Sequence, residues 1–305
     1  MSILKVHHFT TYRYNEPVGF GEHRWLFRPR DSQEQRLILA ERNVTPAPAS
    51  TNWIHDVFNN QIALVEFDEM ARELTFESSI TLEHTPLAGL HFDTDDAART
   101  WPFTYEPETL ADLEAYRTVH YPDPAVEAWA KRLAPKTGTM DTAKLLLKLT
   151  HAVSETLSYS RRTDPGTQQP ALTLERKRGT CRDFTLLMME AARHLGFAAR
   201  FVTGYIYVPA RDEARLHGGG ATHAWVQIFL PGAGWVEFDP TNGIVGNRDL
   251  IRVGVARDPR QARPLSGSFH GERSVYLGME VDVLVSKLVD TTTVGHEGAS
   301  VSFRG

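Results

Sequence analysis

The stretch Arg178-Gly179-Thr180-Cys181-Arg182-Asp183-Phe184 contains the only cysteine among 305 residues. A polar, turn-forming segment ends at Gly179, and an apolar-rich run follows from Phe184 to Ala192. This order predicts a loop that delivers Cys181 onto the first turn of a buried helix. A lone cysteine is also compatible with an inert buried side chain, so the rest of the sequence must distinguish the two interpretations.

The residues around Cys181 suit a reactive thiol for a physical reason. The nucleophilic form of cysteine is the thiolate, which a helix N-terminus and a nearby imidazolium both favour. Thr180 followed three residues later by Asp183 fits a capping box or a near variant of one. Gly179 is expected to permit a sharp approach and to leave room for substrate beside the sulfur. The free N–H groups of the first turn could form half of an oxyanion hole.

A base and an orienting carboxylate are predicted further along the chain. His223 begins a strand-like run directly after a glycine-rich segment, and Asp239 ends the next such run just before Pro240. The short turn at 231–234 predicts an antiparallel hairpin, which would place its opening histidine beside its closing aspartate. Such a pair is also compatible with a structural role. Together with Cys181, however, it matches the relay of a Cys-His-Asp triad.

Composition argues against several other classes of protein. Hydrophobic residues make up 41% and charged residues 23%, with a net charge of −5, so there is no basic field to favour nucleic acid. One cysteine rules out an intrachain disulfide and disfavours a zinc–thiolate cluster. The N-terminus lacks the apolar core of a signal peptide, and no run reaches the roughly 18 apolar residues that span a bilayer. We expect a cytoplasmic protein with no metal, cofactor, nucleic-acid or membrane partner.

The sequence pattern predicts two structural regions and a tail. Residues 1–100 contain short strand-like runs separated by turn signals, which is typical of an antiparallel β domain. From residue 101 to 290 the apolar period becomes helical and then strand-like again, and the tail 291–305 is expected to be flexible. Helices are expected over 109–117, 124–133 and 142–157. Strands are expected over 198–208, 223–230, 234–239, 251–256 and 274–285.

Four separated segments resemble the transglutaminase-like (papain-like) family of cysteine enzymes. The matching pieces, in order, are 178–184, 195–205, 222–226 and 234–242, and residues 1–100 resemble the β-rich region that precedes this core in bacterial members. The resemblance implies an α+β fold with helices packed on an antiparallel sheet. It also implies that Cys181 is the nucleophile, His223 the general base and acid, and Asp239 the orienting carboxylate. Arg182 stands where bacterial relatives often carry glutamine.

The resemblance further implies an enzyme that processes amides of a peptide or protein. The thiolate would attack the carbonyl, release an amine and leave a thioester, which water would hydrolyse as in a protease or amidase. An amine would instead complete a transfer reaction, as in crosslinking transglutaminases, and this alternative stays open. Tyr159 is a candidate second oxyanion donor, unless its ring only packs under the loop before Cys181.

Other interpretations of the same residues remain to be weighed. The fold could serve as a non-catalytic binding or assembly module with the β domain as its interaction surface. A metal site formed by Cys181, His217 and His223 is disfavoured because the site would have a lone thiolate. Trp225 and Trp235 flank the predicted pair and are expected to form walls that exclude water. A homo-oligomer is left open.

Overall fold

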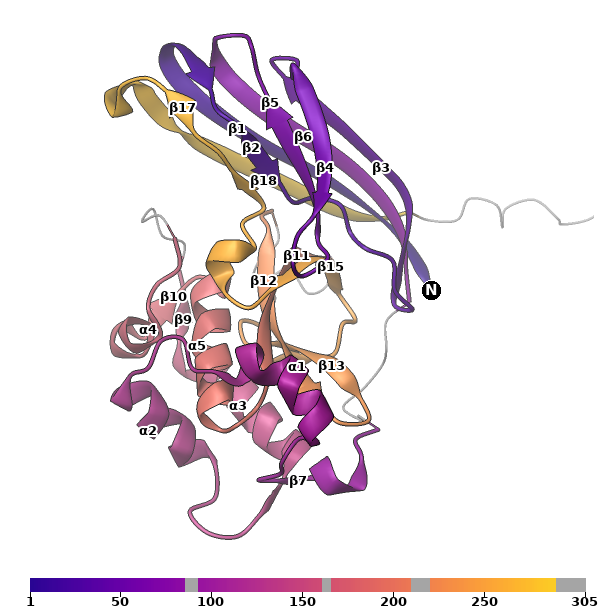
Figure 1. Cartoon of the computed structure of the whole chain (residues 1–305), viewed down its shortest axis with the longest axis vertical. Helices are drawn as coiled ribbons and strands as arrows, with labels where there is room; N and C mark the ends of the chain where they lie inside the picture. The colour runs from indigo at the N-terminus through magenta and orange to yellow at the C-terminus, as the bar shows by residue number, and fades with distance from the viewer. Residues whose placement is uncertain (86–92, 161–165, 210–219, 289–305) are drawn as a thin grey trace, which may run out of the picture.

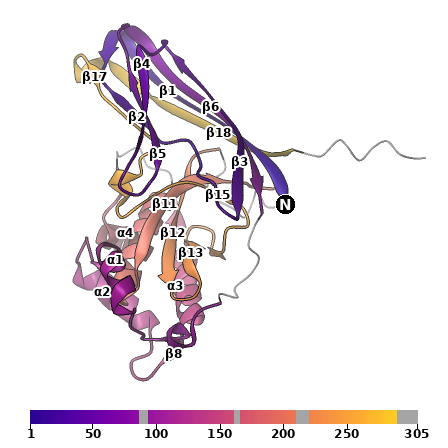
Figure 2. The same ribbon diagram turned by 45° about the vertical axis from the view of Figure 1, so that its right-hand side comes forward.

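The computed structural model describes residues 1–85, 93–160, 166–209 and 220–288. Figure 1 shows an all-β part at one end of the molecule and, at the other, a core in which helices surround a second sheet. Figure 2 shows the same two parts after a turn of the view. This is the α+β arrangement expected from the sequence, whereas the predicted tail 291–305 lies outside the described residues.

Two antiparallel sheets stack in the β part and enclose its hydrophobic core. The alternating buried and half-buried residues of the long strands explain this packing, because successive side chains point to opposite faces. The first sheet contains β1 (Ser2–Phe20), β3 (Gln35–Thr45), β6 (Ala71–His84), β17 (Phe269–His270) and β18 (Tyr276–Leu288). The second contains β2 (His23–Trp25), β4 (Ser50–His55), β5 (Gln61–Glu66) and β16 (Leu265–Ser266).

The last described strand pairs with the first. β18 runs antiparallel along β1, with Ile3 opposite Leu288 and Tyr12 opposite Met279. The other side of β1 pairs with β6. The division at residues 100 and 290 stays a prediction of domain organisation. Within the described residues, β16, β17 and β18 all lie in the sheets of the β part.

The core contains a five-stranded antiparallel sheet with the order β14-β13-β12-β11-β15. Its strands are β11 (Ala199–Ile206), β12 (His223–Leu230), β13 (Gly234–Asp239), β14 (Ile244–Val245) and β15 (Leu250–Ala256). Short strands also pair as β7 (Thr100–Trp101) with β8 (Met140–Asp141), and as β9 (Ser158–Tyr159) with β10 (Arg178–Gly179). The strands predicted near 198, 223, 234 and 251 are confirmed.

Helices surround this sheet and one of them occupies the centre of the core. They are α1 (Pro107–Arg117), α2 (Pro124–Leu133), α3 (Thr142–Thr156), α4 (Pro170–Arg176) and α5 (Cys181–His194). The three helices predicted before residue 160 are confirmed, whereas α4 was not predicted. Helix α5 contacts α2, α3 and α4 on its outer sides and β11 and β12 on its inner side.

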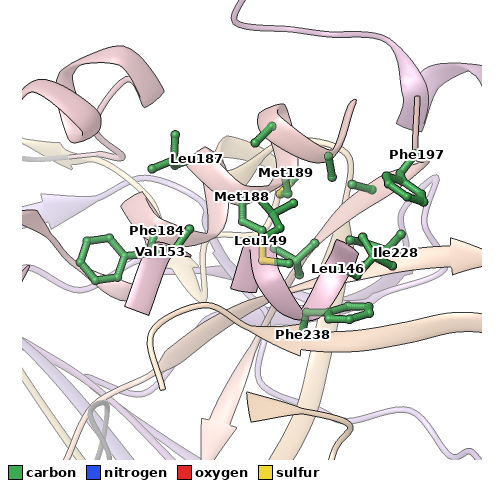
Figure 3. Packing of buried hydrophobic residues seen from close by; sticks show 14 of the residues in the cluster. Leu146, Leu149, Val153, Phe184, Leu187, Met188, Met189, Phe197, Ile228 and Phe238 are labelled. Carbon is green, nitrogen blue, oxygen red and sulfur yellow. The ribbon is translucent and has the colours of Figure 1, made fainter. Parts of the chain in front are cut away.

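Helix α5 is buried because apolar residues cover most of its surface. Figure 3 shows Phe184, Leu187 and Met188 of α5 among side chains of α3 and of the core sheet, including Leu149 and Ile228. Burying large apolar side chains of this kind contributes roughly 1.5–3 kcal/mol each. The N-terminus of α5, with Cys181, is therefore held rigidly by the packing of the rest of the helix.

Two buried side-chain amides join the β part to the core sheet. The Asn60 amide donates to the carbonyl oxygen of Val255 at 2.7 Å, and its oxygen accepts the N–H of Val255 at 2.9 Å. Gln35 makes the equivalent pair of bonds to Arg252, at 2.7 and 3.0 Å. Each amide thus bonds both the N–H and the carbonyl oxygen of one residue of β15, as a residue of a paired strand would. These bonds fix the position of the β part relative to the core sheet.

Candidate active site

Cys181 is the first residue of α5, and its side chain is nearly buried, with 6% exposure. Thr180 precedes it in an extended conformation, as an N-cap residue does. The carboxylate of Asp183 accepts the backbone N–H of Thr180 at 2.8 Å, which completes the capping box predicted from the sequence. The thiol therefore lies at the positive end of the helix dipole.

The same aspartate also fixes the segments that lead to Cys181. Buried Asp183 accepts the N–H of Gln168 at 2.6 Å and the hydroxyl of Thr180 at 3.0 Å. A Cβ atom on Gly179 would lie 2.8 Å from the Cβ of Asp183 and 3.2 Å from the ring of Phe184. The glycine therefore makes room for the protein's own Asp183 and Phe184, which differs from the predicted role of leaving space for substrate.

Tyr159 lies beside the approach to Cys181. Strands β9 and β10 pair in parallel with Tyr159 opposite Gly179, and the N–H of Ser160 donates to the carbonyl oxygen of Gly179 at 2.9 Å. Half-buried Tyr159 packs against the hydrophobic cluster that contains Cys181. The position is compatible with both roles considered from the sequence, so the hydroxyl as an oxyanion donor stays a prediction.

The hairpin predicted for His223 and Asp239 is confirmed. Strands β12 and β13 pair antiparallel, with Val226 opposite Phe238 and Leu230 opposite Gly234. The His223 ring and the Asp239 carboxylate meet at the open end of this hairpin, with Nε2 and Oδ2 2.9 Å apart and both side chains fully buried. This is the juxtaposition that the short turn implied.

Asp239 is held as a carboxylate by several donors. Asn242 donates its side-chain amide to Oδ2 at 2.7 Å, and the N–H of Thr241 donates to Oδ1 at 2.9 Å. Burial opposes ionisation, but the charge on His223 and these hydrogen bonds hold the pKa of Asp239 below its ordinary value. Asn242 and Thr241 are site residues that sequence reasoning did not assign, although both lie within the 234–242 motif.

His223 interacts with both of the other candidate residues. Burial alone would lower its pKa, but the carboxylate of Asp239 and the interaction with the Cys181 side chain raise the pKa of His223 from 6.5 to about 10. Since Nε2 faces Asp239, and Nδ1 makes no hydrogen bond within the part of the chain that is described, Nδ1 is the ring nitrogen left for the thiol. The structure thus brings the three residues into one electrostatically coupled group.

Trp225 and Trp235, which were both expected to shield the site from water, lie at opposite ends of the hairpin. Trp225 stacks on the His223 ring, with centroids 5.9 Å apart and planes 26° apart. Trp235 lies at the turn end of the hairpin opposite Phe229, where Arg200 stacks on its ring at 4.0 Å. The expectation is therefore wrong for Trp235, which packs away from the His223–Asp239 pair.

Arg182 connects α5 to neighbouring segments of the protein. Its guanidinium donates to the carbonyl oxygen of Pro259 at 2.6 Å and lies 4.7 Å from the centre of the Phe201 ring. A weaker bond of 3.4 Å reaches the carbonyl oxygen of Ala262. The residue next to Cys181 thus ties α5 to the loop that follows β15.

Across residues 1–85, 93–160, 166–209 and 220–288, no cluster of three or more histidine, cysteine, aspartate or glutamate side chains is arranged to hold a metal ion. His217, one member of the disfavoured metal site, lies outside the described residues. None of the described helices is long and apolar enough to cross a membrane.

Comparisons with known families agree with this geometry. The bacterial transglutaminase-like N-terminal region matches residues 4–83, and the transglutaminase-like superfamily matches residues 128–240. The second match spans Cys181, His223 and Asp239. The chain therefore belongs to the transglutaminase-like superfamily and carries the N-terminal region of its bacterial members, as the motifs predicted.

Individual relatives and structures are similar along most of the chain. The "Uncharacterized protein Rv2569c" of Mycobacterium tuberculosis is 27% identical over 292 residues, which cover 92% of both chains. The "Uncharacterized protein ML0607" of Mycobacterium leprae is 27% identical over 287 residues, covering 92% of this chain and 98% of the relative. A crystal structure of "a Putative Cysteine Protease" from Cytophaga hutchinsonii has a TM-score of 0.69 at 17% identity, covering 94% of this chain and 91% of that one. This similarity supports the fold.

The charge on His223 can be tested directly. Because its pKa is raised from 6.5 to about 10, the charged pair stabilises the folded state fully below about pH 6.5 and loses this effect as the pH rises through about 10. NMR of the ring nitrogens should therefore show a titration midpoint near pH 10. In Asp239→Asn the midpoint should fall, since the main group that raises the pKa is removed. A wild-type midpoint near 6.5 would contradict the coupled group.

Proposed function

We propose that the protein is a cysteine hydrolase that cleaves amide bonds of a peptide or protein substrate. One observation carries the proposal: a fully buried His223 is bonded to Asp239 and coupled to a cysteine at a helix N-terminus. Imidazolium and helix dipole both favour a thiolate, which is the nucleophilic form. A scaffold has no physical need for all three groups, so the arrangement favours catalysis over a binding or assembly module.

The reaction would proceed in two steps. The Cys181 thiolate attacks the amide carbonyl, His223 protonates the departing amine, and the C–N bond breaks to leave a thioester. Water then attacks the thioester while His223 takes its proton, and the C–S bond breaks, which releases the carboxylic acid and restores the thiolate beside protonated His223. Asp239 keeps the imidazole oriented and stabilises its charged form in both steps. The N–H groups at the start of α5 would stabilise the oxyanion.

The same thioester could be resolved by an amine instead of water, which would make the protein an amine transferase. Mass spectrometry of a peptide library, incubated with and without an added primary amine, separates these outcomes. Cleaved backbone indicates a protease, deamidated glutamine an amidase, and amine-tagged glutamine a transferase. The proposal expects hydrolysis products even when the amine is present.

Cys181→Ser provides the matched control for the library, because it changes one atom and keeps the helix start. Every product should disappear in this variant. Products that persist, or a wild-type protein that gives none from a broad library, would remove the catalytic proposal and return the binding module to consideration.

Tyr159→Phe tests the proposed second oxyanion donor. Loss of one donor typically slows the chemical step by 10²–10³-fold, so we expect kcat to fall about 100-fold with little change in KM. Alkylation of Cys181 by iodoacetamide forms no oxyanion, and its rate should stay the same. If Tyr159 only packs under the loop, removal of the hydroxyl will leave kcat within a factor of about two.

A further inference from the structure

We infer that the cavity between the β part and the core binds an acidic segment of the peptide substrate. This inference rests on the proposed function and adds the substrate class. It also assigns a role to the β part, for which the sequence suggested none beyond an interaction surface.

The cavity has a volume of about 490 Å³, and both parts of the molecule form its walls. Strand β2 contributes Arg24, and the hairpin of β4 and β5 contributes His55 and Val57. The loop after β15 contributes Arg260 and Arg263. Figures 1 and 2 show this loop, in orange, between the core helices and the β part.

Positive charge dominates the lining. Asp56 is the only carboxylate among the described residues that line the cavity, and it is engaged in the hairpin turn. Its oxygens accept the N–H of Phe58 at 2.9 Å and both the N–H and the side-chain amide of Asn60 at 2.8 and 2.9 Å. The lining therefore sets three arginines against one carboxylate, whose oxygens are occupied by the hairpin turn.

Two of the three lining arginines are available for an anion. Arg260 is paired with Asp258 through two bonds of 2.8 and 3.0 Å. Arg24 and Arg263 are exposed and form no ion pair with any other described residue. A guanidinium recognises a carboxylate through paired hydrogen bonds, so these two side chains fit the acidic residues of a peptide.

An apolar contact accompanies the charges. Val57 lines the cavity from the tip of the hairpin and is 90% exposed, so its side chain is accessible to an apolar group of a ligand. Asn60 pins this hairpin to Val255, so the valine is presented on a fixed support. An acidic residue beside an apolar one would satisfy both kinds of contact.

The cavity is joined to the catalytic helix by short connections. Arg182, the neighbour of Cys181, holds the carbonyl oxygens of Pro259 and Ala262 in the loop that carries Arg260 and Arg263. Phe58 lines the cavity and packs against the hydrophobic cluster that contains Cys181. A peptide bound in the cavity would therefore contact a loop that is bonded directly to the first turn of α5.

Binding can be measured without turnover in the full chain carrying Cys181→Ala. Fluorescence anisotropy would compare a short fluorescein-labelled peptide with two Val-Glu pairs against the same peptide with Val-Gln pairs. The Glu peptide should bind more tightly, and added salt should weaken it because the contacts are exposed charges. Arg24→Gln and Arg263→Gln should each weaken binding about three- to fivefold, the range expected for one exposed ion pair.

Arg132→Gln is the matched control, because it removes the same charge from a separate cavity between α2 and α4. It should leave the affinity unchanged. Equal binding of the Glu and Gln peptides, an equal loss in Arg132→Gln, or displacement by inorganic phosphate at a concentration below that of free glutamate would each overturn the inference. Since no turnover is needed, a failure of amide cleavage would contradict the proposed function alone, and the binding result would still decide the acidic site.

Discussion

Replacing His223 with alanine should slow the alkylation of Cys181 by iodoacetamide at pH 6 about 100-fold. In the wild-type protein the imidazole, held by Asp239, keeps its charge at this pH because its pKa is raised to about 10. That charge favours the thiolate. An ordinary cysteine, with a pKa of about 8.5, has only about 0.3% thiolate at pH 6. The rate is read from the mass of the intact protein over time.

The comparison needs a histidine that does not touch the site. His7 lies on β1, where it bonds to Glu77, so His7→Ala should leave the alkylation rate unchanged. Asp239→Asn should give an intermediate rate, because the imidazole remains but loses the carboxylate that sustains its charge. Wild-type alkylation in His223→Ala would show that the thiol does not depend on the imidazolium, and the triad would have to be abandoned.

Replacing Glu190 with alanine should lower the free energy of unfolding by about 3–5 kcal/mol. Glu190 and Arg193 form an ion pair on α5, and neither side chain has any exposure. The other oxygen of Glu190 accepts the N–H groups of His120 and Tyr121, both at 2.9 Å. The substitution therefore leaves a buried guanidinium without its counterion and two N–H groups without their acceptor.

An exposed ion pair of the same kind provides the control. Glu127 and Lys131 are four residues apart on α2 and are 43% and 62% exposed, so Glu127→Ala should cost less than about 0.5 kcal/mol. Urea unfolding followed by circular dichroism measures both variants against the wild type. A cost below about 1 kcal/mol for Glu190→Ala would mean that the buried pair is not a major contributor to the stability of the core.

The parts of the fold that were predictable depend on signals close together in the sequence. The capping box at Thr180 and Asp183 and the apolar run behind Cys181 define α5 within a single segment. The short turn before Gly234 fixes the hairpin and so brings His223 to Asp239. The same register places Trp235 next to the turn, so its distance from Asp239 was already implied by the sequence and was overlooked.

Helix α4 was missed because it is short. It has seven residues, of which only Pro170 and Thr173 are buried. A segment this short is not long enough to show a helical repeat of apolar residues. Pro170 at its first position was the available signal, since proline is favoured where no helical N–H bond is needed. Lys177 ends the helix in the left-handed conformation, with φ of 51°, a place where glycine or asparagine is more usual.

Contacts between distant segments could not be predicted. Asn60 and Val255 are 195 residues apart, and the sequence around neither residue predicts that they form hydrogen bonds with each other. The bonds from Arg182 to the loop after β15 are of the same kind, because they join residues that are 77 and 80 positions apart. The cavity between the β part and the core is formed by these long-range contacts. This explains why the sequence alone did not predict a role for the β part in substrate binding.

The pairing of β18 with β1 sets an order for folding during synthesis. Strand β1 leaves the ribosome long before one of its partners, β18 (Tyr276–Leu288), has been made. All core strands, up to Ala256, are complete before that moment. One edge of β1 therefore stays open until β18 has emerged, and an open edge is a template for pairing with other chains. The nascent protein therefore still presents this edge after every strand of the core sheet has emerged.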